Sequence, residues 1–467
     1  MNLKTVIGLE IHLQLKTKSK MFCGCDNNAE GKEPNTVVCP VCMGMPGTLP
    51  VANKQAIDWT IMTGLAFGAK INPKSKFDRK HYFYPDLPKG YQISQYDMPF
   101  CSGGKMEIQN PKSEILKTIR IRRIHLEEDA GKLIHPKGAN YSLVDLNRAG
   151  TPLMEIVTEP DINSPAEAKT FLQKLRTVLR HLGVSDADME KGHLRCDANI
   201  SIEVDGKEGT PAEIKNMNSF KMVERALTYE EERQRGIISE GEKVEKETRG
   251  WIDAKGMTVS QRGKEYAEDY RYFPEPDLPP FAIAQNQISK IKNQISENLE
   301  MVEEKYKKIG IGQSDISVLT SNFAKKKYFD ALAEKLSNDQ EKILAAKWIV
   351  NRFFDSDYSI DKYAVFIKKI SAGEIPKPRA MEVIKKSAEE KKSIEEIIKD
   401  LQLTKLDDSD KINSIVAGVI SENEKPVADF RAGREQALKY LIGQVMAKSK
   451  GQADPQLVEK ILKEKLK

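Results

Sequence analysis

The chain changes its residue pattern once, at a cluster of prolines, and this change limits the folds open to it. The cluster comprises Pro274, Pro276, Pro279 and Pro280, and a helix cannot run through it. Short β-branched runs and turn residues come before it, whereas Lys- and Glu-rich segments with helical spacing prevail from about Gln287. At roughly 150 residues per domain, the 467 residues predict about two to four domains, strand-rich first and helical afterwards.

Local signals predict several elements. One helix is marked at both ends, because Ser164 can act as N-cap with Pro165 and Glu167 behind it, and Gly183 can end it. A second helix is expected from about Ser219 to Gly236. Strands are expected at Thr5–Leu15, Ile119–Ile124, Tyr141–Leu146, Leu153–Val157, Ala198–Val204 and Ala212–Ile214. Two last helices are expected, from Arg434 to about Lys450, ended by Gly451, and after Asp454 as N-cap.

Composition favours a globular protein outside membranes. No apolar run approaches the roughly 20 residues of a membrane span, and Met1–Ile7 resembles neither a signal nor a transit peptide, so we expect a cytoplasmic protein. The net charge of +5 is modest, but residues 425–467 contain ten Lys or Arg against five Asp or Glu. This basic tail weakly favours nucleic acid over simple solvation. Its candidate nucleic-acid-binding residues are Arg431, Arg434, Lys448 and Lys450.

Four of the six cysteines lie in one short region, as Cys23-Gly24-Cys25 and Cys39-Pro40-Val41-Cys42. Two such pairs match a structural zinc site, because each pair can hold one edge of a tetrahedron. The alternative is disulfides or unrelated thiols, and the first pair is closer than in most zinc sites. Cys101 and Cys196 stand alone and are expected to be buried thiols.

The run His125-Leu126-Glu127-Glu128-Asp129-Ala130-Gly131-Lys132 places three acids in a row after a predicted strand. In an extended chain, His125, Glu127 and Asp129 point one way, and Leu126 and Glu128 the other. Adjacent carboxylates repel, so a hard cation such as Mg²⁺ is a natural partner. A charged loop in water is the alternative.

Two further segments supply matching groups. Glu10 and His12 are two apart in a predicted strand, so both project from one face and can share a cation with Glu127. Glu155 lies inside the apolar run Pro152–Val157, where an unpaired carboxylate is unfavourable. Either a cation or a salt bridge to a base such as Arg148 would satisfy it.

Missing and ambiguous motifs reduce the number of reaction types that the chain can catalyse. No Gly-Lys pair is followed by Ser or Thr, which excludes a P-loop, and no Gly-x-Ser-x-Gly elbow exists. The segment 101–105 is typical of a hairpin turn rather than a phosphate loop. Basic and aromatic residues interleave in 77–86 and 91–96, a pattern typical of base stacking or of an internal polar network.

Motifs along the whole chain resemble one family, the B subunits of the bacterial aspartyl/glutamyl-tRNA(Asn/Gln) amidotransferases. The matching segments are residues 6–12, 77–86, 125–132, 142–148, 194–199, 215–220, 269–277 and 449–455. The resemblance implies a heterotrimer with an amidase subunit and a small third subunit. It implies a carbon–nitrogen ligase with glutamine as nitrogen donor, which uses ATP to phosphorylate Glu or Asp misattached to tRNA. Ammonia from the amidase then crosses a channel and displaces phosphate, giving Gln-tRNA or Asn-tRNA.

The resemblance also implies residue roles and a fold. It assigns Mg²⁺ to Glu10, His12, Glu127 and Glu155, and the ammonia channel or site edge to Lys80, Lys89, Glu128 and Asp277. The implied α+β fold is a cradle domain with a mixed or antiparallel sheet and flanking helices (1–290, with the zinc segment 23–42). An all-α domain (291–402) and a small helical tRNA-binding tail domain (403–467) follow. The cysteine quartet occurs in only some members, so zinc rests on its spacing.

A different class of function fits part of the same sequence. A zinc-containing tRNA-binding scaffold without catalysis would use the cysteines and the basic tail. It would have no need of Glu10, Glu127 and Glu155, and these acids therefore distinguish the two hypotheses.

Overall fold

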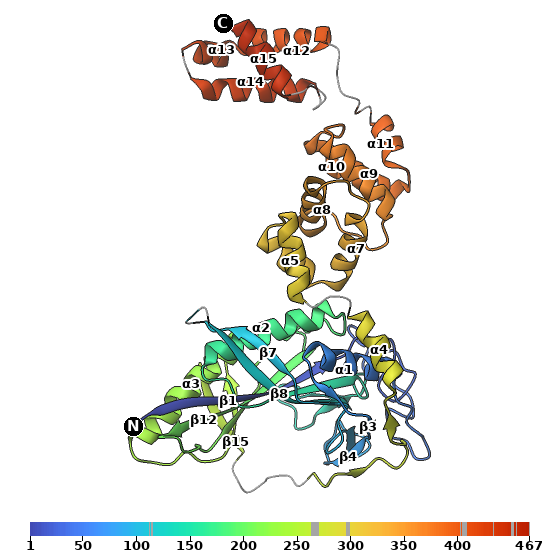
Figure 1. Cartoon of the computed structure of the whole chain (residues 1–467), viewed down its shortest axis with the longest axis vertical. Coiled ribbons are helices and arrows are strands. Elements are labelled where there is room, and N and C mark those ends of the chain that lie inside the picture. Colours follow the sequence, from blue (N-terminus) through green and yellow to red (C-terminus); the bar gives the residue numbers. More distant parts are fainter. Residues whose placement is uncertain are drawn as a thin grey trace. The chain divides into compact units, whose positions relative to one another are not determined.

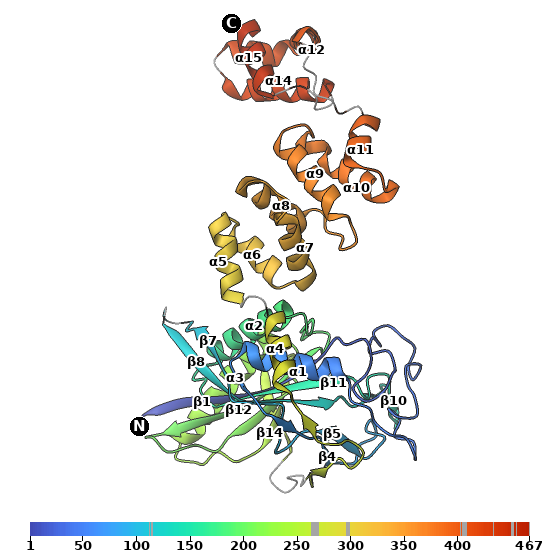
Figure 2. The same ribbon diagram turned by 45° about the vertical axis from the view of Figure 1, so that its right-hand side comes forward.

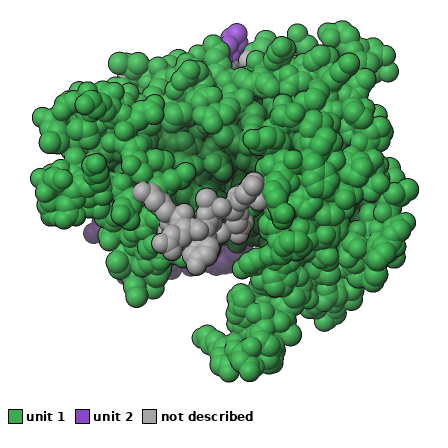
Figure 3. Space-filling model, turned by 90° about the horizontal axis from the view of Figure 1, so that it is seen from below, with its two compact units in different colours: residues 1–301 green, residues 302–467 purple. Residues whose placement is uncertain are grey.

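The computed structural model describes residues 1–467 except 112, 114, 263–269, 296–298, 402, 404–408, 433, 450–452, 454 and 467. The chain divides into two compact units, residues 1–301 and residues 302–467 (Figure 3). The described strands all belong to the first unit, and the described elements of the second are helical. The expected fold class, a strand-rich α+β part followed by helices, is confirmed.

A mixed sheet forms the frame of the first unit (Figure 1). Its strands are β1 (Leu3–Gln14), β2 (Lys70–Ile71), β6 (Cys101–Ser102), β7 (Lys105–Gln109), β8 (Leu116–Glu128), β11 (Pro152–Thr158), β12 (Leu194–Val204), β13 (Ala212–Lys215), β14 (Thr248–Ile252) and β15 (Met257–Arg262). Within the described residues the order is β15-β14-β13-β12-β1-β11-β8-β6-β2, and β7 pairs with β8. β13 and β14 run parallel, while β1 is antiparallel to both its neighbours.

Strand β1 shows why the sheet has two unlike faces. Ile7, Leu9, Ile11 and Leu13 are fully or almost fully buried, and the residues between them are only partly buried. Because side chains alternate along a strand, one face of the sheet is apolar and the other is polar. The polar face therefore carries Glu10 and His12.

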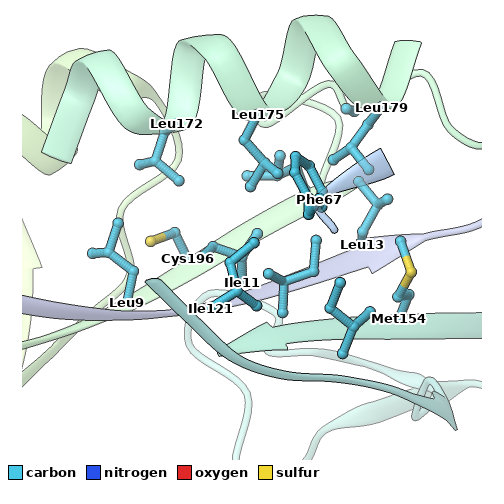
Figure 4. Packing of buried hydrophobic residues seen from close by; sticks show 14 of the residues in the cluster. Leu9, Ile11, Leu13, Phe67, Ile121, Met154, Leu172, Leu175, Leu179 and Cys196 are labelled. Atoms are coloured by element: carbon cyan, nitrogen blue, oxygen red, sulfur yellow. The ribbon is translucent and has the colours of Figure 1, made fainter. Parts of the chain in front are cut away.

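Helices cover the apolar face. Leu172, Leu175 and Leu179 of α2 (Pro165–His181) point onto Leu9, Ile11 and Leu13 (Figure 4). The predicted start of α2 is confirmed, since the Ser164 side chain accepts from the Glu167 N–H with Pro165 in the first turn. Helix α3 (Phe220–Ser239) begins after its N-cap Ser219 as expected but continues past Gly236.

Glu127 and Glu128 lie inside a strand rather than after one, because β8 extends through Glu128, and Asp129 follows it. Pairing with β11 continues to Glu128 and keeps the run extended. The segment 101–105 is not the expected hairpin turn, because the chain continues along β8 in one register from β6 to β7. The expected strand at 141–146 is shorter, and forms β10 (Leu143–Asp145) opposite β9 (Lys132–Ile134).

Smaller elements complete the first unit. Helix α1 (Lys54–Ala66) lies beside α4 (Gln285–Gln294), as both ribbon views show (Figures 1 and 2). Ile291 of α4 joins the core of this unit. The remaining strands form two small sheets: β16 (Phe273–Pro274), β4 (Asp78–His81) and β5 (Tyr91–Ser94) in that order, and β17 (Phe281–Ala282) with β3 (Lys74–Ser75).

The second unit contains two separate hydrophobic cores. One includes Tyr306, Phe329 and Phe366 and is formed by α5 (Leu299–Ile309), α6 (Gln313–Thr320), α7 (Phe323–Ala333), α8 (Asp339–Asn351), α9 (Ile360–Ser371), α10 (Ala380–Glu390) and α11 (Ile394–Asp400). The other includes Val416 and Leu441 and is formed by α12 (Ser409–Glu422), α13 (Glu424–Arg431), α14 (Glu435–Lys448) and α15 (Pro455–Leu466). The last two helices agree with the sequence prediction, but Lys450, Gly451 and Asp454 lie outside the described residues.

Candidate active site and metal centre

A row of ionisable groups crosses three strands on the polar face of the sheet. Register pairs His12 of β1 with Glu155 of β11, and Glu155 with His125 of β8. The Glu155 Oε2 lies 3.6 Å from the His12 Nε2 and 3.0 Å from the His125 Nε2. One carboxylate therefore lies between two imidazoles that are 113 residues apart in the chain (125 − 12).

Glu127 closes the group from the end of β8. Its carboxylate oxygens lie 4.0 Å from the His12 Nε2 and 3.8 Å from the His125 Nε2, and it accepts a 2.8 Å hydrogen bond from the Ser94 hydroxyl. His12, Glu127 and Glu155 each offer one ligand atom within 4.8 Å of the others. Three of the four predicted Mg²⁺ ligands thus come together.

Glu10 does not belong to that group of three. Its side chain accepts a 3.1 Å hydrogen bond from the Asn199 amide instead. Burial and the nearby Glu155 carboxylate raise the pKa of Glu10. Glu10 therefore lies on the same face of the sheet, close enough for the charge of Glu155 to raise its pKa. It contributes no ligand atom to the group of His12, Glu127 and Glu155.

Sequence reasoning missed His125 as a member of the site. Its ring is almost fully buried, and its Nδ1 has no hydrogen-bond partner among the described residues. Burial opposes its charge, but Glu155 and Glu127 outweigh burial and raise the pKa of His125 to about 9. Alternation along the strand already indicated that His125 and Glu127 lie on one face, and this pattern could have identified His125. The contact between His125 and Glu155 depends on strand register, which the sequence does not show.

Positive groups offset the two buried carboxylates. Burial opposes their charge, yet His125 lowers the pKa of both Glu127 and Glu155, and Lys80 contributes. Lys80 is partly buried with its ammonium 4.6 Å from the centre of the Tyr270 ring. Arg148 is not the base that satisfies Glu155, because its guanidinium donates to the Ala130 and Gly131 carbonyls. The cluster therefore has the oxygen donors and low pKa values that a divalent cation requires.

The other face of the same strand holds a second polar site. Glu128 accepts hydrogen bonds from the Lys89 ammonium and from the Ile93 N–H, the latter at 3.0 Å. A pocket of about 210 Å³ contains Lys89, Glu128 and Asp277. Asp277 also pairs with Arg79 at 3.2 Å. Three of the four residues predicted for the ammonia channel or the site edge thus line one pocket, and the fourth, Lys80, lies beside the acid cluster.

Part of the segments that interleave basic and aromatic residues forms an internal network near these sites. Arg79 donates two 2.8 Å hydrogen bonds to the buried Glu275 carboxylate. Its guanidinium also lies 4.3 Å from the centre of the Tyr91 ring. These contacts favour the polar-network interpretation for Arg79 and Tyr91, whereas Phe83, Tyr84 and Tyr96 are exposed.

The four cysteines of the predicted zinc site also come together. The Sγ atoms of Cys23, Cys25, Cys39 and Cys42 lie within 4.8 Å of one another, and all four are free thiols. The Cys39 N–H donates to the Cys42 Sγ at 3.1 Å. A four-thiolate set of this size is compatible with zinc.

A buried lysine accompanies the cysteines and was not foreseen. Lys20 is 1% exposed, and its ammonium donates to the Val37 carbonyl at 2.8 Å and to the Cys42 Sγ at 3.7 Å. Hydrogen bonding from Cys23 lowers the pKa of Cys42, and Lys20 contributes to the lowering although burial opposes it. The lysine therefore offsets part of the negative charge that four thiolates gather.

The tail residues predicted to bind tRNA are exposed where the structure describes them. Arg434 pairs with Asp429 at 3.1 Å, Lys448 pairs with Glu422, and Arg431 donates to the Leu466 carbonyl at 3.4 Å. Lys450 lies outside the described residues.

No described helix has the length and hydropathy of a membrane span.

Comparisons with known proteins cover nearly the whole chain. Residues 5–289 match the family model of the GatB/GatE catalytic domain, and residues 327–466 match that of the GatB domain. A Thermomicrobium roseum protein is 47% identical over 483 residues, covering 100% of this chain and 99% of its own length. A Thermotoga maritima protein is 43% identical over 485 residues, with the same coverage. Both are named as the B subunit of an aspartyl/glutamyl-tRNA(Asn/Gln) amidotransferase.

The charge on His125 can be tested by NMR of the metal-free protein. Since its pKa is raised from 6.5 to about 9, its ion pairs stabilise the fold fully below pH 6.5, and this contribution is lost as pH rises through 9. In Glu155→Gln the main partner is gone and burial dominates, so the pKa of His125 should fall to 6.5 or below. Titration of histidine ring resonances measures both values, with Glu159→Gln as the control. A neutral His125 at pH 7 in the unaltered protein would contradict the prediction.

The role of Lys20 can be tested through metal affinity. Groups that contact metal ligands typically change affinity by about 10- to 100-fold when removed, so Lys20→Met should weaken zinc binding by that order. Competition with a coloured chelator measures the affinity. Lys18→Met changes an exposed lysine two residues away and should have no effect. Equal affinities for the two variants would exclude the role assigned to Lys20.

Proposed function

Because the chain belongs to the family of B subunits of the aspartyl/glutamyl-tRNA(Asn/Gln) amidotransferases, we propose that it activates misacylated tRNA. In this proposal, the γ-phosphoryl group of ATP passes to the side-chain carboxylate of Glu-tRNA(Gln) or Asp-tRNA(Asn). The products are an acyl phosphate and ADP. Ammonia then attacks the acyl carbon and phosphate leaves, which gives Gln-tRNA(Gln) or Asn-tRNA(Asn).

The observation that supports activation is the cluster of His12, Glu127 and Glu155 on the polar face of the sheet. Two buried carboxylates beside an imidazole offer ligands for Mg²⁺, with Glu10 two residues along the same strand face. Bound Mg²⁺ would offset charge on the phosphate oxygens. No covalent enzyme nucleophile is needed for this transfer, which agrees with the absence of nucleophile motifs from the sequence.

The chain's own residues have separate tasks in this proposal. His125 and Lys80 keep Glu127 and Glu155 ionised, because both lie close enough to lower their pKa values. The pocket with Lys89, Glu128 and Asp277 lies on the other side of β8, where we place the arrival of ammonia. Its polar walls can donate to and accept from a molecule of that size.

The proposed complex contains an amidase subunit, which releases ammonia from glutamine, and a small third subunit. The four cysteines bind structural zinc, and the tail of α12 to α15 contacts the tRNA through Arg431, Arg434, Lys448 and Lys450. The second hypothesis, a scaffold without catalysis, would leave the buried acid cluster without a task.

Glu127→Gln in the reconstituted trimer should lower ATP-dependent activation of Glu-tRNA(Gln) or Asp-tRNA(Asn) by about 100-fold or more, because it removes one charged ligand of a cation site. Formation of ADP in the presence of each misacylated tRNA measures this step. Glutaminase activity of the amidase should persist, since its chemistry does not use this cluster. Glu107→Gln alters an exposed acid on β7 and serves as control. Full activation by Glu127→Gln would instead favour the scaffold hypothesis.

Deletion of residues 409–467 should weaken tRNA binding by the trimer and reduce its dependence on salt. These helices form their own hydrophobic core, so the deletion leaves the other cores intact. Each phosphate contact that is lost should lower the slope of log affinity against log salt by roughly 0.7 to 0.9. Filter binding at several salt concentrations measures both quantities. An unaltered slope would show that the basic tail makes no phosphate contacts.

A further inference from the structure

The turn that follows the last two cysteines lies directly against Lys89. Backbone hydrogen bonds from Met43 to Cys39 and from Met45 to Pro40, at 3.0 and 2.9 Å, form this turn. Gly44 adopts a φ of +67° within it, and a Cβ added there would lie 2.5 Å from the Lys89 Cγ and 3.1 Å from its Cα. Only glycine lets the two segments approach this closely.

Lys89 in turn connects this turn to the pocket. Its ammonium pairs with the buried Glu128 and lies 5.5 Å from the centre of the Tyr91 ring and 5.9 Å from that of Phe22. The pocket wall includes Cys23, Cys42 and Gly44 together with these residues. Two of the four thiols and the Lys89–Glu128 pair therefore line the same pocket.

The acid cluster is separate from that structure. Glu127 and Glu128 are neighbours on β8, but Glu127 contacts His12 and His125, while Glu128 contacts Lys89. Neither His12 nor Glu155 lines the pocket. A change in the conformation of the cysteine segment is therefore expected to move Lys89, which it contacts, and to leave the candidate ATP-dependent site in place.

We propose that a metal bound by the four cysteines positions Lys89 through Gly44, and thereby controls how ammonia passes the Lys89–Glu128 pocket. This inference rests on the proposed function for the passage of ammonia. The cysteine pairs are separated by 13 residues, and without a metal only hydrogen bonds and packing hold the two pairs together. Metal binding lowers the freedom of such a loop and fixes the turn that it ends in.

The test compares three variants of the full-length chain in the reconstituted trimer. Cys39→Ser removes a metal ligand. Gly44→Ala retains all four ligands but places a methyl group against Lys89. Gly31→Ala is the matched control, because Gly31 lies in the same segment at a φ of +73° with nothing within 4 Å of an added Cβ.

Four quantities are measured for each variant: zinc content, ADP formation with misacylated tRNA, amide formation with glutamine, and amide formation with added ammonium chloride. Gly44→Ala should retain zinc and ADP formation, while its ratio of glutamine-supported to ammonium-supported amidation falls about 10-fold. Cys39→Ser should lose zinc and show the same fall in the ratio. Gly31→Ala should match the unaltered chain in all four.

An unchanged ratio in Gly44→Ala, or an equal loss of both amidation rates, would overturn the inference. If Cys39→Ser fails to assemble, Gly44→Ala still decides, since it leaves the thiols in place. Failure of the proposed function gives a different result, namely no ADP formation by the unaltered trimer with either misacylated tRNA.

Discussion

The sheet of the first unit buries two carboxylates close together, and its structure depends on compensating their negative charge. Glu127 and Glu155 lose hydration on strands β8 and β11, and an isolated buried carboxylate is strongly unfavourable. His125, His12 and Lys80 supply the compensating positive or polar groups from three strands. Under α2 the opposite face of the same sheet is apolar, so the hydrophobic core and the acid cluster occupy different faces.

Local signals predicted much of this arrangement. Alternation in β1 placed Glu10 and His12 on one face, and the capping residues of α2 fixed its start. Cysteine spacing predicted a four-thiol group that the structure forms. These patterns follow from short-range geometry, which a single sequence contains.

Contacts between distant segments could not be predicted in the same way. His125 joins the site because register sets it opposite Glu155, and Lys20 lies beside Cys42 only after the loop folds back. Sharing a face also did not place Glu10 within the ligand group, because its side chain accepts a hydrogen bond from the Asn199 amide instead. The sequence thus indicated which residues take part in the two sites better than it indicated the distances between their side chains.

The neighbouring glutamates of β8 limit how this protein can evolve. Inserting or deleting one residue upstream of them within the paired part of β8 would exchange Glu127 and Glu128 between the two faces, because strand side chains have a period of two. Both sites would be lost at once. The irregular pairing between β8 and β11 falls at Val157 and Thr158, beyond the ion-pair row. Changes in strand length among relatives are therefore expected at that end of β11 and in loops, and not between residues 124 and 128.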